Sequence, residues 1–126
     1  MKYLIDTHVF LWMASEPSRL SAPATQACQT GRLWLSVASI WEIAIKAQIG
    51  RLNIPGSLRD FVSQHLKAGQ ISVLTIHARH AFRLGELPLH HRDPFDRMLA
   101  AQSLEDGLPL ITRDPLLEPY EIERVW

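Results

Sequence analysis

The chain has 126 residues, of which 47% are hydrophobic and 21% are charged, and this is the composition of one globular domain. Its 13 basic and 13 acidic residues cancel, which argues against a strongly basic coat for DNA. The lone cysteine, Cys28, excludes an internal disulfide and fits a reducing cytoplasm. No apolar run approaches the roughly 18 residues that suggest a membrane span. We therefore expect a single cytoplasmic domain over residues 1–126 with no membrane partner.

Short apolar strands alternate with helices along the chain, and glycines close several of the helical patterns. In chain order, we predict a strand over Lys2–Ile5, helices over His8–Ala14 and Pro23–Thr30, a strand over Leu33–Leu35, helices over Ser39–Ile49 and Leu58–Ala68, a strand over Ile71–Leu74, a helix over His77–Gly85, a loop over Leu87–Arg92, a helix over Pro94–Asp106, and strands over Leu110–Ile111 and Ile122–Trp126.

This alternation is typical of an α/β fold in which helices flank a central parallel sheet in three layers. The crossover helices run antiparallel to the strands, so each helix begins at the edge of the sheet where the strands end. Open α/β folds bind their ligands at that edge. Residues at strand ends and helix starts are therefore the first candidates for a functional site.

Five acidic residues occupy such positions. Asp6 follows the first strand, and Asp114 follows the fourth. Glu42 lies in the first turn of the helix that comes after the second strand, and Asp93 and Asp96 flank the start of the last long helix. We expect all five carboxylates at one edge of the sheet.

Carboxylates gathered in this way repel one another. A pair of like charges a few ångströms apart costs about 4 kcal/mol at an effective dielectric constant near 20. A bound cation would compensate this repulsion, and ligands that are all oxygen atoms suit Mg²⁺ or Mn²⁺ better than zinc. The pattern therefore indicates a site for a hard divalent cation.

Ordinary helix chemistry is an alternative explanation for Glu42. Ser39 and Glu42 have the spacing of a capping box, and Glu42 stands four residues before Lys46, as in a common helical ion pair. Asp6 has the weakest explanation of this kind, because it interrupts an apolar stretch.

Helix ends also offer an explanation for the later acids. Asp93 precedes a proline, as an N-cap residue often does, and the helix dipole favours an acid such as Asp96 in the first turn. Asp114 also precedes a proline and could simply open a turn. The residues alone leave capping and metal binding open, and only their predicted convergence favours a site.

Arginines lie beside these acids in the sequence: Arg92, Arg97 and Arg113. One interpretation is that they are counter-charges for the carboxylates, and the other is a clamp for phosphate. The two roles can coexist.

The histidines and tryptophans have weaker signals. No metal-binding spacing such as H-x-x-x-H supports His8, His90 or His91 as ligands. The tryptophans, Trp41 among them, stand among aliphatic neighbours, which favours the core over a base-stacking surface.

Four stretches together resemble a known family: YLIDTHVFLW, SVASIWEIAIKAQIGRL, LPLHHRDPFDRMLAAQSL and LPLITRDPLL. They are similar to PIN-domain proteins, in particular the VapC-type toxins of type II toxin–antitoxin pairs. The stretches are spread over the whole length of the chain, so the resemblance is to a complete domain. It implies a PIN-like fold built on a parallel sheet.

The family's acidic quartet falls by position on Asp6, Glu42, Asp96 and Asp114. Asp96 matches the third acid because the family pattern continues into an Ala-Ala pair, here Ala100-Ala101, and Asp93 is an extra acid. Many relatives have a small polar residue two positions after the first Asp, where this chain has His8.

The resemblance implies hydrolysis of RNA phosphodiester bonds by an endoribonuclease that depends on Mg²⁺ or Mn²⁺. We expect Asp6 and Asp96 to hold the cation, with Asp114 acting through water or a second ion. We expect Glu42 to orient a water molecule or accept its proton.

The expected substrate contacts follow from the residues beside the acids, and the expected partners follow from the resemblance. Arg97, Thr112 and Arg113 form the expected substrate-binding group, in which Thr112 also supports the loop around Asp114. The expected partners are RNA, a small cognate antitoxin and a second copy of the chain. We expect part of the apolar stretch Val9–Met13 to line one of these interfaces.

Two other functions remain as alternatives. One is phosphoryl transfer through an aspartyl phosphate at Asp6, but such phosphatases have a second Asp two residues later, where this chain has His8. Receiver domains need a lysine after a late strand, and the lysines here are Lys2, Lys46 and Lys67. The other alternative is a binding module without catalysis, whose acids are only caps and ion pairs.

Overall fold

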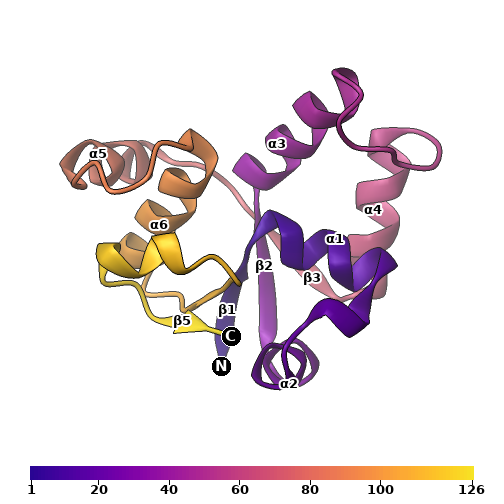
Figure 1. Ribbon diagram of the computed structural model, residues 1–126, viewed down its shortest axis with the longest axis horizontal. Helices are drawn as coiled ribbons and strands as arrows, with labels where there is room; N and C mark the ends of the chain where they lie inside the picture. The colour runs from indigo at the N-terminus through magenta and orange to yellow at the C-terminus, as the bar shows by residue number, and fades with distance from the viewer.

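A five-stranded parallel sheet forms the centre of the computed structural model, which describes residues 1–126 (Figure 1). The strands are β1 (Lys2–Ile5), β2 (Arg32–Ser36), β3 (Ile71–Leu74), β4 (Leu110–Ile111) and β5 (Arg124–Val125). Their order across the sheet is β3-β2-β1-β4-β5, and every neighbouring pair is parallel. The predicted α/β class and parallel sheet are confirmed.

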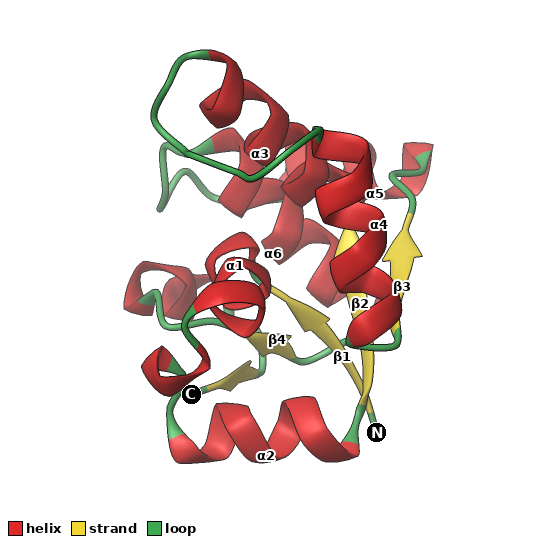
Figure 2. Ribbon diagram, turned by 90° about the vertical axis from the view of Figure 1, so that its right-hand side faces the viewer, coloured by secondary structure: helices red, strands yellow, loops and turns green.

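The helices lie on both sides of this sheet (Figure 2). They are α1 (Thr7–Ser15), α2 (Ala22–Thr30), α3 (Val37–Gln48), α4 (Leu58–Ala68), α5 (Ala78–Glu86) and α6 (Pro94–Asp106), with the short 3₁₀ helices η1 (Pro17–Arg19) and η2 (Pro115–Tyr120). None of these helices is both long enough and apolar enough to cross a membrane.

Two hydrophobic clusters cover the two faces of the sheet. Successive strand residues point to opposite faces, and β1 shows this at Leu4 and Ile5, which are both fully buried. Ile5 belongs to a cluster built with α1, α2, α3 and α4, whereas Leu4 packs with Leu99 of α6 and Leu117 of η2. The sheet is therefore the middle of three layers, as the alternation of elements predicts.

The start of α3 differs from the prediction. The helix begins at Val37 because the Ser36 hydroxyl accepts a hydrogen bond from the main-chain N–H of Ala38 at 3.0 Å and so caps it. The Ser39 hydroxyl instead accepts a hydrogen bond from Thr7 at 2.8 Å. The capping box predicted for Ser39 is therefore wrong, and Glu42 lies in the second turn of α3 instead of the first.

Two predictions about apolar residues also need correction. Val9 and Phe10 are buried in the core. Within the stretch Val9–Met13, only the residues after Phe10 can therefore contribute to the expected interface. Trp41, which we assigned to the core, is 57% exposed on α3. Its ring meets that of Phe95 edge-on, with 5.3 Å between the ring centroids.

Candidate active site

The candidate site lies at the edge of the sheet where the parallel strands end. Asp6 directly follows β1, and Asp114 comes three residues after β4. β1 and β4 are hydrogen-bonded neighbours, with Ile5 paired to Ile111. The topology thus brings together two acids that are 108 positions apart in the chain, as predicted.

Three of the five acids are helix caps. Asp6 accepts a hydrogen bond from the His8 N–H at 3.1 Å, and Asp114 accepts one from the Leu116 N–H at 2.9 Å. Asp93 caps α6 through Oδ1, which accepts hydrogen bonds from the main-chain N–H groups of the second and third helical residues. The capping interpretation is therefore correct for Asp93. Asp114, which we expected to open a turn, caps the 3₁₀ helix η2, and Asp6 is also a cap. Capping fixes the direction of these carboxylates and leaves oxygen lone pairs free for other partners.

Glu42 has a different environment. One carboxylate oxygen, Oε2, lies 2.7 Å from the Lys46 ammonium group, which confirms the helical ion pair. The other oxygen, Oε1, is buried without any hydrogen-bond partner. An unpaired buried carboxylate oxygen is costly. A water molecule or a cation bound beside it would remove this cost.

Asp96 is the acid whose ionisation the site disfavours. Burial, followed by the negative charges of Asp6, Asp93 and Glu42, raises its pKa from 3.8 to about 7, against an opposing effect of His91. Asp6, Asp93 and Glu42 therefore lie close enough to Asp96 for their charges to repel its carboxylate. Asp96 makes no capping hydrogen bond, so helix capping does not explain its position.

Asp6 is stabilised as a carboxylate. Burial by itself would raise the pKa of Asp6, but interactions with His8 and a hydrogen bond from Thr112 outweigh burial and lower it. Thr112 is fully buried, and its hydroxyl donates to Asp6 Oδ2 at 2.5 Å while accepting from the Asp114 N–H at 3.1 Å. Thr112 therefore supports the loop around Asp114, as expected, and holds Asp6 as well.

His8 lies beside Asp6 on the solvent side. Its Nδ1 is 3.8 Å from Asp6 Oδ1, and the ring is more than half exposed. The pKa of His8 is raised mainly by Asp6, against the effect of partial burial.

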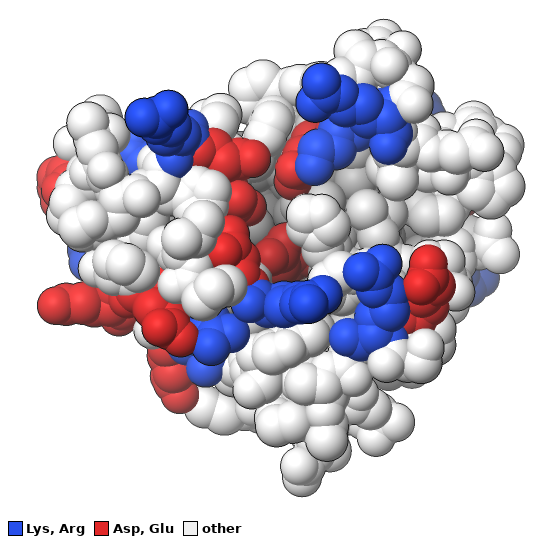
Figure 3. Space-filling view, viewed as in Figure 1, with Lys and Arg blue, Asp and Glu red and all other residues white.

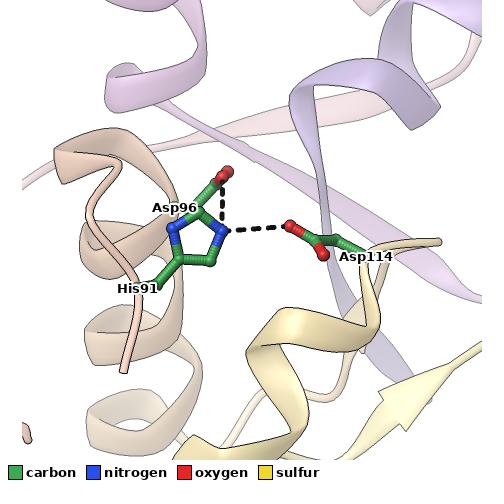
Figure 4. Close-up of side chains that lie close together, drawn as sticks. All are labelled: His91, Asp96 and Asp114. Atoms are coloured by element: carbon green, nitrogen blue, oxygen red, sulfur yellow. Dashed lines mark hydrogen bonds and ion pairs between the residues drawn. The ribbon is translucent and has the colours of Figure 1, made fainter. Parts of the chain in front are cut away.

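His91 belongs to the site, although sequence reasoning set it aside as a ligand. Its Nε2 lies 3.1 Å from Asp114 Oδ2 and 3.4 Å from Asp96 Oδ2 (Figure 4). No spacing rule could find it, because the contact to Asp114 spans 23 residues. The available signal was that His91 stands two residues before the capping acid Asp93.

The arginines are placed differently from one another. The Arg97 guanidinium donates to the main-chain carbonyl groups of Leu84 and Leu87, at 3.4 and 3.3 Å, and so links α6 to the end of α5. Arg97 is therefore a weaker candidate for phosphate binding than the exposed Arg113.

Figure 3 shows acidic side chains lining a hollow in this face of the molecule, with lysine and arginine side chains around it.

The donor atoms at this edge fit a divalent cation. Carboxylate oxygens of Asp96 and Asp114 lie within 4.8 Å of each other, beside a ring nitrogen of His91. Glu42 adds a buried carboxylate oxygen that has no hydrogen-bond partner. A cation beside Asp96 would lower its raised pKa and so favour its ionised form. A donor set in which carboxylate oxygens predominate suits Mg²⁺ or Mn²⁺.

Comparisons with known proteins agree with this arrangement. Residues 3–120 match the PIN-domain family. The chain is 30% identical over 128 residues to Ribonuclease VapC22 of Mycobacterium tuberculosis (strain ATCC 25618 / H37Rv), and the match covers 98% of this chain and 97% of that protein.

Solved structures share the fold at low sequence identity. One of these structures is VapBC2 from Rickettsia felis bound to a promoter DNA fragment. A chain of it superposes on this chain with a TM-score of 0.73 and 12% identity over 100% of both chains. VapBC-1 from nontypeable Haemophilus influenzae gives a TM-score of 0.66 and 17% identity, covering 98% of this chain and 96% of that chain. With a family match over nearly its whole length, the chain belongs to the PIN-domain family.

Proposed function

We propose that this PIN-domain protein is a metal-dependent endoribonuclease of the VapC type, the toxin of a toxin–antitoxin pair. The observation that carries the proposal is the state of Glu42 and Asp96, the two acids that helix capping does not explain. Glu42 has a buried oxygen without a partner, and the neighbouring carboxylates raise the pKa of Asp96. The resemblance to Ribonuclease VapC22 supports RNA as the substrate.

In the proposed mechanism, Asp6 and Asp96 would hold one Mg²⁺ or Mn²⁺ ion, and Asp114 would contribute through water or a second ion. The ion supplies positive charge for the phosphoryl oxygens and makes water more acidic. Glu42 Oε1 accepts a hydrogen bond from the attacking water and takes its proton. The water oxygen forms a bond to phosphorus as the bond from phosphorus to the ribose oxygen of the leaving strand breaks, and that ribose oxygen takes a proton from solvent water.

Thr112 and Arg113 assist this chemistry in different ways. Thr112 is buried, so it acts by orienting Asp6 and the main chain at Asp114, without touching the substrate. Arg113 is exposed beside Asp114 and is the better placed arginine for a phosphate of the RNA backbone. We place this activity in the cytoplasm, where RNA is available and the Cys28 thiol stays reduced.

A cognate antitoxin is the second proposed partner. A pocket of about 240 Å³ opens between α1 and α4, and its lining includes Met13, Ala14 and His65. Met13 is the residue of the predicted interface stretch that can contact a partner at this pocket, because Val9 and Phe10 are core residues. An apolar side chain of an antitoxin would fill this pocket.

A second copy of the chain is the third proposed partner. Trp41 and Ile45 of α3 and its C-cap residue Ile49 are spaced four residues apart, so they form one apolar stripe, and they are 57%, 36% and 60% exposed. An exposed stripe of this kind is typical of a helix that packs against another protein surface.

The alternatives have less support. An aspartyl phosphate at Asp6 lacks the residues that this chemistry uses, because His8 stands where a second Asp is needed and no lysine follows β4. A binding module without catalysis would account for the three caps and for the ion pair of Glu42 with Lys46, but it would leave the buried Glu42 Oε1 and the position of Asp96 without an explanation.

RNA cleavage tests the proposal directly. The protein is incubated with single-stranded and hairpin oligoribonucleotides in Mn²⁺, in Mg²⁺ and in EDTA. Wild type should cleave in either metal and not in EDTA, and Asp6→Asn and Asp96→Asn should fold without cleaving. RNA that stays intact after prolonged incubation with Mn²⁺ would refute the proposed function, whereas wild-type turnover by Asp6→Asn or Asp96→Asn would refute the assignment of that residue to the metal site.

A further inference from the structure

His91 occupies the centre of the candidate site, and its two ring nitrogens face different partners. Nδ1 accepts a hydrogen bond from the main-chain N–H of Asp93 at 3.1 Å. Nε2 points at Oδ2 of Asp114 and at Oδ2 of Asp96 (Figure 4). The ring is mostly buried, with 12% of the side chain exposed.

The contact with Asp93 determines which nitrogen of the neutral ring carries the proton. A nitrogen that accepts a hydrogen bond has no proton, so the proton of a neutral imidazole is on the other nitrogen. In His91 that nitrogen is Nε2, which faces two carboxylates. A histidine nitrogen that binds a metal must be free of its proton. The geometry therefore makes Nε2 a hydrogen-bond donor and not a metal ligand.

The main chain around His91 is held from the opposite side. The His91 N–H donates to the Tyr120 hydroxyl at 2.8 Å, and Tyr120 is buried against Leu99 and Leu117. The neighbouring His90 ring packs on Tyr120 with 5.3 Å between the ring centroids. These contacts fix the loop between α5 and α6, and with it the direction of Nε2.

We infer that His91 is a positioning residue: its Nε2–H orients the carboxylates of Asp96 and Asp114 toward the cation without binding the cation itself. This inference rests on the proposed metal-dependent function. Donors that orient metal-binding carboxylates typically change metal affinity by about 10–100-fold when they are removed.

Metal affinity is the first test. Mn²⁺ binding to the RNA-free protein is titrated by electron paramagnetic resonance for wild type, His91→Ala, His91→Gln and His65→Ala. His91→Ala should bind Mn²⁺ about 10–100-fold more weakly. His91→Gln should recover most of the affinity, because its amide N–H can occupy the position of Nε2–H. His65→Ala is the matched control, since His65 lies on α4 and makes no contact with the carboxylates of the site, and its affinity should stay unchanged.

A spectroscopic measurement separates positioning from ligation. A histidine nitrogen bound directly to Mn²⁺ gives a ¹⁴N hyperfine coupling in pulsed electron paramagnetic resonance. We expect wild type to show no such coupling from His91. A coupling that disappears in His91→Gln would overturn the inference and make His91 a ligand.

The remaining outcomes are also distinct. A folded His91→Ala protein that binds Mn²⁺ with wild-type affinity would overturn the role of His91 alone. Failure of wild type to bind Mn²⁺ at all would instead refute the metal-dependent function from which the inference starts. Circular dichroism identifies a His91→Ala protein that does not fold, and His91→Gln then still carries the spectroscopic test.

Discussion

Thr112 donates a hydrogen bond from its hydroxyl to Oδ2 of Asp6, across 106 positions of the sequence. Both residues are buried, and the same hydroxyl accepts a hydrogen bond from the Asp114 N–H. One side chain thus ties together the acids that follow β1 and β4. The register of these strands, in which Ile5 pairs with Ile111, makes this contact possible.

Thr112→Val should therefore destabilise the metal-free protein. Valine has a similar shape but has no donor for Asp6 and no acceptor for the Asp114 N–H. A buried polar group left without its partner typically costs about 1–3 kcal/mol. Urea unfolding in EDTA measures the change in the free energy of unfolding, with Thr112→Ser as the control that keeps the hydroxyl. A valine variant as stable as wild type would show that water replaces the Thr112 hydroxyl.

Asp96→Asn should separate metal binding from a helix-terminal role. In EDTA, the variant should be at least as stable as wild type, because it removes a charge that the other carboxylates repel. A ligand at about a hundred times its Kd stabilises the native state by roughly 2.7 kcal/mol. Thermal melts with Mn²⁺ should show this gain for wild type and little gain for the variant.

A role for Asp96 only at the helix start leads to a different result. Neutralising an acid that interacts favourably with a helix dipole costs about 0.3–1 kcal/mol, with or without metal. Equal destabilisation of Asp96→Asn in EDTA and in Mn²⁺ would therefore contradict the assignment of Asp96 to the metal site.

The stability of the metal-free protein should fall as the pH rises from about 4 to about 7. The pKa of Asp96 is raised to about 7 in the folded protein, so over this range the folded state binds more protons at this group than the unfolded state. The loss of stability caused by ionising Asp96 is complete above the pKa of Asp96 in the folded protein. It is absent below the pKa of Asp96 in the unfolded protein. Each unit of pKa difference corresponds to about 1.4 kcal/mol, before solvent screening reduces it.

Urea unfolding of wild type and Asp96→Asn from pH 4 to pH 8 in EDTA measures this effect as the difference between the two proteins. The difference isolates Asp96 from His8, whose raised pKa also makes stability fall with rising pH. The groups that face Asp96 are His91, Asp6, Asp93 and Glu42. A difference that does not change with pH would show that these neighbours do not raise the pKa of Asp96.

Trp41→Glu should convert the proposed homodimer into a monomer, because it places a charge in the exposed stripe of Trp41, Ile45 and Ile49. Size-exclusion chromatography with light scattering at micromolar concentration measures the mass. Phe82→Glu is the matched control, since Phe82 is 71% exposed on α5, away from the stripe. A dimer that survives Trp41→Glu would place the interface elsewhere, and a monomeric wild type would refute the dimer.

Local patterns in the sequence are sufficient to predict the order of the strands and helices. They also predict that Asp6, Asp93 and Asp114 lie at the ends of these elements. Apolar runs that end at an acid, and acids that precede a proline, are properties of a few neighbouring residues. In a parallel α/β fold, strand ends and helix starts share one edge, so the convergence of these acids could also be predicted.

Only the tertiary structure decided the start of α3, the contacts of His91 and the exposure of Trp41. Ser36 and Ser39 can both cap a helix, and the choice falls on Ser36 because the Ser39 hydroxyl is bonded to Thr7 of α1. His91 reaches Asp114 only because Tyr120 of η2 holds its loop. In each case the deciding partner is distant in the sequence, and its position depends on how whole elements pack, which local patterns do not record.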